Sequence, residues 1–301
     1  MIVSPTLSTE YYSRFLEELE YPEEAVSELS RHLELMLSRR ECAEEINAIL
    51  AEFLDESFDY TSALGRAREL FKAHSLADFP SCHAFVAHLF AVTRQLYKAR
   101  GIDDSIFIAT AKDLRYKAVE CKLVEGVWGT FVPGWYSGLL RLKIFALGRL
   151  QYEKRALGVD VTVDGVALTK DTPALYIHIP RSEERLEPEA THRSYKMAAE
   201  FFGDGYFGKG PKVFTCSSWL LFPEHNAMLK PESNIRKFMA DFTIVSEKTY
   251  ENHDHLWRIF DKRYTGDPDT MPCKSSIHRA YLDKIRKGEP LGSAHGVFIY
   301  K

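Results

Sequence analysis

The sequence predicts an α+β protein in two parts: an N-terminal helical bundle over residues 1–130 and, over residues 131–301, a mixed, mainly antiparallel sheet flanked by helices. Two observations favour this class. Up to residue 130 the apolar residues recur at helical spacing, and beyond it short runs of β-branched and aromatic residues alternate with helical segments. The length of 301 residues also exceeds the usual size of one domain.

The clearest helix of the bundle begins near residue 22. Pro22 suits the first position of a helix, Glu23 and Glu24 complement the positive end of the helix dipole, and apolar residues then recur at helical spacing. The same spacing predicts further helices over residues 42–54, 60–73, 80–99 and 104–123.

A stretch rich in glycine and aromatic residues, 126–138, interrupts the helical pattern, and we expect it to pack the two parts together. A strand is then predicted over residues 139–154 and a hairpin over residues 158–168, in which Asp164-Gly165 supplies the turn. The second part therefore begins as an antiparallel meander.

The next segment predicts a strand, a loop, a helix and a second strand. The apolar run 174–179 ends at Pro180, a helix is expected over residues 188–202, and a glycine-rich turn leads to the apolar run 213–222. A ligand could bind where the loop meets the helix. The remaining predictions are a short helix at 225–229, a strand at 240–246, helices at 250–263 and 275–287, and a last strand at 296–300.

Composition excludes several classes of protein. No apolar run approaches the roughly 20 residues that span a bilayer, and the N-terminus does not resemble a signal peptide, so we expect a cytoplasmic protein without a membrane partner. Five scattered cysteines suggest reduced thiols and no structural zinc site. Residues 131–301 hold 25 Lys/Arg against 21 Asp/Glu, an excess that could favour an anionic ligand but is too small for nucleic acid.

The order of predicted elements resembles the GNAT-type N-acetyltransferase superfamily, whose members place an antiparallel meander before a strand–helix–strand unit that holds acyl-coenzyme A. Four phrases resemble, more specifically, a bacterial family of two-domain acyltransferase-like proteins with a helical N-terminal domain and a GNAT-like C-terminal domain. They are FALGRLQYE (145–153), HIP (178–180), CSSWLLFP (216–223) and SNIRKF (233–238). The similarity covers nearly the whole chain.

The resemblance implies a place for acyl-coenzyme A, with acetyl-coenzyme A as the expected donor. In such enzymes the two central strands splay apart, the acyl-pantetheine arm inserts between them, and backbone N–H groups of the following helix hold the diphosphate. The loop between strand and helix contains no glycine and is rich in glutamate, unlike the superfamily's usual phosphate loop. The implied cofactor-binding residues are Ile179, Arg181, Arg185, Ser217 and Ser218.

Direct acyl transfer needs a base for the attacking amine or hydroxyl and a proton donor for the departing thiolate. His178 is the candidate base, because it lies near the end of the first central strand and the unperturbed pKa of an imidazole is close to neutral pH. Glu224 and His225 form a second candidate pair. Cys216, on the neighbouring strand, is a candidate nucleophile or proton donor.

Three functions remain open from the sequence. The first is an acyltransferase that moves an acyl group from acyl-coenzyme A to a small-molecule or peptide acceptor. The second is a non-catalytic GNAT-like binding or scaffold protein, which the glycine-free loop favours. The third is a Cys/His hydrolase or thioesterase that uses Cys216 and His178.

Overall fold

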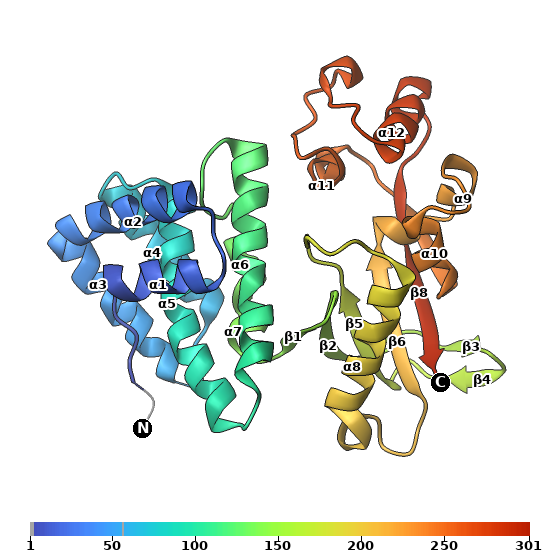
Figure 1. Cartoon of the computed structure of the whole chain (residues 1–301), viewed down its shortest axis with the longest axis horizontal. Helices are drawn as coiled ribbons and strands as arrows, with labels where there is room; N and C mark the ends of the chain where they lie inside the picture. Colours follow the sequence, from blue (N-terminus) through green and yellow to red (C-terminus); the bar gives the residue numbers. More distant parts are fainter. Residues whose placement is uncertain (1–2, 56) are drawn as a thin grey trace. The chain divides into compact units, whose positions relative to one another are not determined.

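Helices build the first unit of the computed structural model, which describes residues 3–55 and 57–301 (Figure 1). This unit ends at Phe145, and the second begins at Ala146. The helical bundle predicted from the apolar spacing is confirmed. Its elements are α1 (Thr9–Glu18), α2 (Glu23–Ser38), α3 (Arg40–Ala51), α4 (Tyr60–Ala73), α5 (Asp78–Ala99), α6 (Asp104–Glu125), α7 (Ser137–Leu140) and the 3-10 helices η1 (Glu52–Leu54) and η2 (Pro133–Tyr136).

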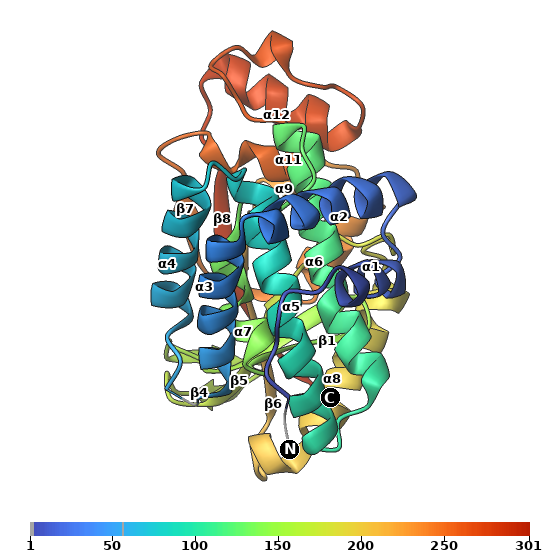
Figure 2. The ribbon, with the colours of Figure 1, turned by 90° about the vertical axis from the view of Figure 1, so that its left-hand side faces the viewer.

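Helix α5 is the centre of the first unit. It contacts α1, α2, α3, α4 and α6, and α3, α4 and α5 run roughly side by side in Figure 2. Every residue from Ser81 to Phe90 is buried. A helix that buries all of its faces belongs in the middle of a bundle rather than at its surface.

The glycine and aromatic stretch 126–138 packs within the first unit. The Trp135 indole N–H donates to Asp113 at 2.8 Å, and the backbone N–H of Thr130 donates to the carbonyl oxygen of Phe79 at 3.0 Å. A Cβ on Gly129 would lie 2.5 Å from the Phe79 backbone, so this close approach requires glycine. The two compact units of the structure divide after Phe145. The domain boundary near residue 130 that the sequence pattern indicates stays a prediction.

A mixed sheet forms the base of the second unit (Figure 1). Among the described residues six strands follow the order β1-β2-β5-β6-β8-β7. Strands β5 and β6 run parallel, and the pairs β2–β5, β6–β8 and β7–β8 are antiparallel. The predicted mixed, mainly antiparallel sheet is therefore confirmed. The strands are β1 (Ile144–Leu147), β2 (Leu150–Ala156), β5 (Pro173–His178), β6 (Lys212–Ser218), β7 (Thr243–Thr249) and β8 (Gly292–Tyr300), with the separate hairpin β3 (Val161–Val163) and β4 (Val166–Leu168).

Helix α8 (Pro188–Phe207) connects β5 to β6 and covers one face of the sheet (Figure 1). The Ser194 hydroxyl lies 2.8 Å from that of Tyr152 on β2, and the Tyr195 ring lies 5.9 Å from the Phe214 ring on β6. The other elements of this unit are α9 (His225–Met228), α10 (Asn234–Ala240), α11 (Trp257–Phe260), α12 (Ser276–Lys287) and the 3-10 helices η3 (Trp219–Leu221), η4 (Asp254–Leu256) and η5 (Pro268–Thr270).

Several predicted elements have other bounds in the structure. The prediction of a single strand over residues 139–154 is wrong. Helix α7 occupies the first residues of that range, and Gly148, at φ +74°, turns the chain between β1 and β2. The strand expected at 240–246 lies at Thr243–Thr249, because α10 extends to Ala240. The helix expected at 250–263 is reduced to η4 and α11, which ends where Asp261 adopts a left-handed conformation.

The helix and strand on either side of the glycine-rich segment also differ from the prediction. Helix α8 continues past residue 202 to Phe207, with a non-helical Gly203 inside it. Strand β6 ends at Ser218, not at residue 222, because the Ser218 side chain accepts a hydrogen bond from the N–H of Leu220 and starts η3.

Candidate acyl-donor site

Strands β5 and β6 part from each other towards their C-terminal ends. Their parallel pairing runs only from Ala174–Val213 to Tyr176–Thr215. Strand β5 nevertheless continues to His178 in its pairing with β2, and β6 continues to Ser218 in its pairing with β8. The pairing thus ends before either strand does, as in the splay that the resemblance implied. The Tyr176 hydroxyl donates to the carbonyl oxygen of Ser217 at 3.3 Å.

His178 belongs to a polar cluster on the sheet face that points away from α8. Its Nε2 lies 3.0 Å from Oε2 of Glu153 on β2, and the Arg155 guanidinium pairs with the same carboxylate at 2.7 Å. Burial raises the pKa of Glu153, but the hydrogen bonds from His178 and Arg155 outweigh it and lower the pKa overall. The sequence did not single out Glu153, because its contact with His178 depends on the register between two strands.

Cys216 lies on the opposite face from His178. Side chains alternate along a strand, and Phe214, two residues before Cys216, packs against Tyr195 of α8. Cys216 is buried, and burial raises the pKa of its thiol well above its ordinary value. His178 therefore shares its face of the sheet with Tyr176 on β5 and with Ser217 on β6, and it is not paired with a reactive thiolate.

The other implied cofactor residues lie on β6 or follow β5 along the chain. Ser217 is exposed on β6, and Ile179 follows β5 directly. Arg181 forms an ion pair with Asp261, whereas Arg185 has a side chain that is 83% exposed, with Glu187 at 4.0 Å. Of the two arginines, Arg185 is thus the one with more freedom to meet an anion.

Glu224 and His225 are placed in a different environment. Glu224 forms an ion pair with Lys284 of α12, and the buried His225 has its Nε2 3.0 Å from the Tyr281 hydroxyl. Burial lowers the pKa of His225. These contacts connect α9 to α12, so the structure gives the pair a packing role and does not join it to the His178 cluster.

Comparison with protein families agrees with this division of the chain. Residues 11–142 match the model of the N-acyltransferase N-terminal domain, and residues 144–298 match that of the GNAT-like C-terminal domain. The chain belongs to this two-domain N-acyltransferase family. The two matches together take in nearly the whole sequence, as the resemblance of its four phrases implied.

Solved structures with the same fold as this N-acyltransferase family member include an acyltransferase in complex with decanoyl-CoA and teicoplanin. It is 22% identical, covers 100% of this chain and 90% of its own, and has a TM-score of 0.69. An acyltransferase mutant in complex with octanoyl-CoA is also 22% identical, with the same coverage and a TM-score of 0.72. No protein with a curated description matches the chain significantly.

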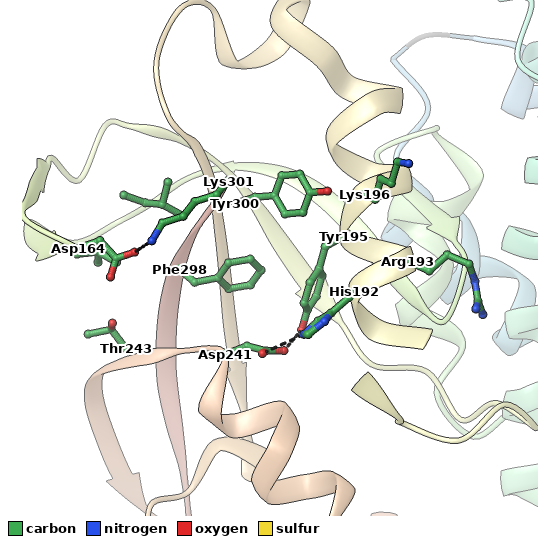
Figure 3. Close-up of a pocket in the computed structure, with 12 residues that line it drawn as sticks. Asp164, His192, Arg193, Tyr195, Lys196, Asp241, Thr243, Phe298, Tyr300 and Lys301 are labelled. Carbon is green, nitrogen blue, oxygen red and sulfur yellow. Dashed lines mark hydrogen bonds and ion pairs between the residues drawn. The ribbon is translucent and has the colours of Figure 1, made fainter. Parts of the chain in front are cut away.

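A hollow lies on the α8 side of the sheet in this N-acyltransferase family member (Figure 3). Asp241, which follows α10, faces the hollow, where it receives hydrogen bonds from His192 and from the Tyr195 hydroxyl, each at 3.1 Å. The cavity has a volume of about 730 Å³, and neither His178 nor Ser217 is among its lining residues. It is therefore separate from the candidate acyl-donor site.

Residues 3–55 and 57–301 contain no cluster of three or more His, Cys, Asp or Glu side chains placed to hold a metal ion. The same ranges contain no helix that is both long and apolar enough to cross a bilayer.

Cysteine labelling tests the position of Cys216 in this family member. Brief treatment of the folded protein with iodoacetamide at neutral pH is expected to modify Cys273, which is exposed, and to leave Cys216 unmodified, because its thiol is buried and protonated. Peptide mass spectrometry measures both sites, and treatment in urea, which exposes every thiol, is the control. Rapid modification of Cys216 in the folded protein would revive the hydrolase hypothesis.

Proposed function

We propose that this protein transfers an acyl group from acyl-coenzyme A directly to an amine or hydroxyl group of an acceptor. The observation that carries the proposal is the splay of β5 and β6 beside the His178 cluster. Where the two strands stop pairing, their backbone edges offer hydrogen-bonding groups to an extended amide chain, which the pantetheine arm of coenzyme A provides. The arm fits the splay as an added strand would.

His178 is proposed as the general base of this reaction. The acceptor nitrogen or oxygen attacks the thioester carbonyl, its proton passes to the imidazole, and the carbon–sulfur bond breaks to release coenzyme A as the thiolate. Attack by the acceptor itself is favoured over a covalent acyl-enzyme, because the Cys216 thiol is buried on the other face of the sheet. Glu224 is not given a catalytic role, since Lys284 already pairs with it.

The diphosphate of the donor is proposed to lie near Arg185 and the N-terminus of α8. Backbone N–H groups at the start of a helix favour anions, and Arg185 adds an exposed cation. Glu187 and Glu189 flank the same helix end and oppose an anion there. This acidic surrounding is the observation that favours the alternative, a GNAT-like binding protein without catalysis.

The acyl chain is proposed to be of medium length, because similar structures hold octanoyl-CoA and decanoyl-CoA. This replaces the acetyl donor expected from the resemblance as the first choice. The acceptor is proposed to be a small molecule or peptide, in the broad class of the teicoplanin present in one similar structure. Donor binding can be tested without knowing the acceptor.

Donor binding is tested by thermal unfolding with coenzyme A, acetyl-CoA, octanoyl-CoA and decanoyl-CoA. We expect the medium-chain donors to raise the melting temperature most, because a ligand present at 100 times its Kd adds about 2.7 kcal/mol to the free energy of unfolding. Free decanoate is the control for non-specific binding of the chain. No shift with any of the four ligands would contradict the proposed function.

A further inference from the structure

Glu153 is connected to His178 by a contact that has little solvent around it. The two side chains are 18% and 14% exposed, and the Glu153 Oε2 to His178 Nε2 distance is 3.0 Å. In the antiparallel register Glu153 pairs with Tyr176 and His178 pairs with Gln151, so the carboxylate and the imidazole lie on a diagonal of the same face.

Two further side chains hold this carboxylate and imidazole in place. The Arg155 guanidinium binds Glu153 at 2.7 Å and lies 4.4 Å from the centre of the Tyr176 ring. The Tyr176 ring in turn lies 4.9 Å from the His178 ring. Glu153, Arg155, Tyr176 and His178 thus form a closed ring of contacts, which we call the β2–β5 cluster.

The contact with Glu153 also determines which imidazole nitrogen carries the proton. The lowered pKa of Glu153 keeps the carboxylate ionised at neutral pH, and an ionised carboxylate can only accept hydrogen bonds. The Nε2 of His178 must therefore be the donor in this contact. In the neutral imidazole the basic lone pair then lies on Nδ1.

We propose that Glu153 is a positioning residue for acyl transfer: it fixes His178 in the Nε2–H tautomer, so that Nδ1 receives the proton of the acceptor. This inference rests on the proposed function of His178 as the base. As the acceptor nitrogen or oxygen bonds to the thioester carbon, its proton moves to Nδ1, and the nearby carboxylate stabilises the imidazolium that forms. Arg155 and Tyr176 hold Glu153 and the ring in register for this step.

A readout that needs no acceptor is nitrogen NMR of the histidine rings. In the wild-type protein at neutral pH we expect the His178 nitrogen shifts of the Nε2–H tautomer, and in Glu153→Ala a mixture of tautomers. The signal of His178 is assigned by its loss in His178→Gln. A wild-type ring protonated on Nδ1 alone would overturn the inference.

The kinetic test compares Glu153→Gln with Glu153→Asp. In Glu153→Gln we expect kcat to fall by about 10- to 100-fold, because the developing imidazolium loses its negative neighbour. For the same reason we expect the acid limb of the kcat/KM profile to move to lower pH. The KM for the acyl donor stays within about threefold, since Glu153 does not touch the donor in this scheme. Glu153→Asp, which keeps the charge, is expected to recover part of kcat.

Controls separate this inference from the proposed function. Glu200→Gln removes an exposed carboxylate on α8 whose nearest cation, Lys196, is 3.9 Å away, and we expect wild-type rates for it. If His178→Gln is inactive while Glu153→Gln keeps full rate and an unchanged pH profile, only the positioning role fails. If the wild-type protein neither binds nor consumes any acyl donor, the proposed function fails, and the tautomer measurement still decides the contact.

Discussion

Replacing His178 with alanine is expected to lower kcat for acyl transfer by about 10²- to 10⁴-fold, because a positioned general base contributes a factor of this size. The affinity for acyl-coenzyme A should change little, since the proposed donor contacts come from the strand edges and the start of α8. Steady-state release of coenzyme A, followed with a thiol reagent in the presence of an amine that the wild-type protein acylates, measures kcat and KM separately.

Two controls make the His178 result specific. The thermal stability of His178→Ala and its shift with decanoyl-CoA should resemble those of the wild-type protein, which shows that the fold and the donor site persist. His74→Ala, at the end of α4 in the first unit, removes a histidine that no proposed step uses. Near wild-type kcat in His178→Ala would assign the base to another residue and leave the splay as a binding feature.

Local signals in the sequence were sufficient for the start of α8 and for the turn of the β3–β4 hairpin. Pro188 marks the beginning of α8, as a proline at the first helical position should. Asp164 and Gly165 both adopt positive φ in the turn of the β3–β4 hairpin, which is the backbone geometry that an Asp-Gly pair favours. These features depend on neighbours within a few residues, so that sequence pattern alone predicts them.

The composition of the site depends on strand register, which the sequence does not reveal. His178 and Cys216 lie on neighbouring strands, as expected. Tyr176 pairs with Thr215, so His178, two residues further along β5, shares a face of the sheet with Ser217. Cys216 precedes Ser217 by one residue, and its side chain therefore points to the opposite face. Strand register also explains why the sequence did not identify Glu153 as a site residue. Its contact with His178 arises between β2 and β5, two segments separated by the β3–β4 hairpin.

The helical unit contains a second histidine with a predicted effect, this time on stability. His83, in the middle of α5, lies between two tyrosines: its Nδ1 is 2.7 Å from the Tyr12 hydroxyl and its Nε2 is 2.7 Å from the Tyr21 hydroxyl. A neutral imidazole can satisfy both, donating to one hydroxyl and accepting from the other. Burial is the main cause that lowers the pKa of His83 from 6.5 to about 3.

Because the pKa of His83 is lower in the folded state, protons bind preferentially to the unfolded chain. The contribution of neutral His83 to stability is therefore complete above pH 6.5 and is lost as the pH falls towards 3, at about 1.4 kcal/mol for each pH unit. Between pH 7 and pH 5 the loss amounts to about 2 kcal/mol. Urea denaturation followed by circular dichroism at the two pH values measures it.

His83→Gln should remove this part of the pH dependence, because an amide can bond to a tyrosine hydroxyl without titrating. The buried His88 also has a lowered pKa, so a smaller dependence is expected to remain in the variant. His74→Gln controls for the loss of a histidine outside the core. An unchanged difference in unfolding free energy between pH 7 and pH 5 in His83→Gln would mean that the imidazole between Tyr12 and Tyr21 is not what makes the folded bundle sensitive to acid.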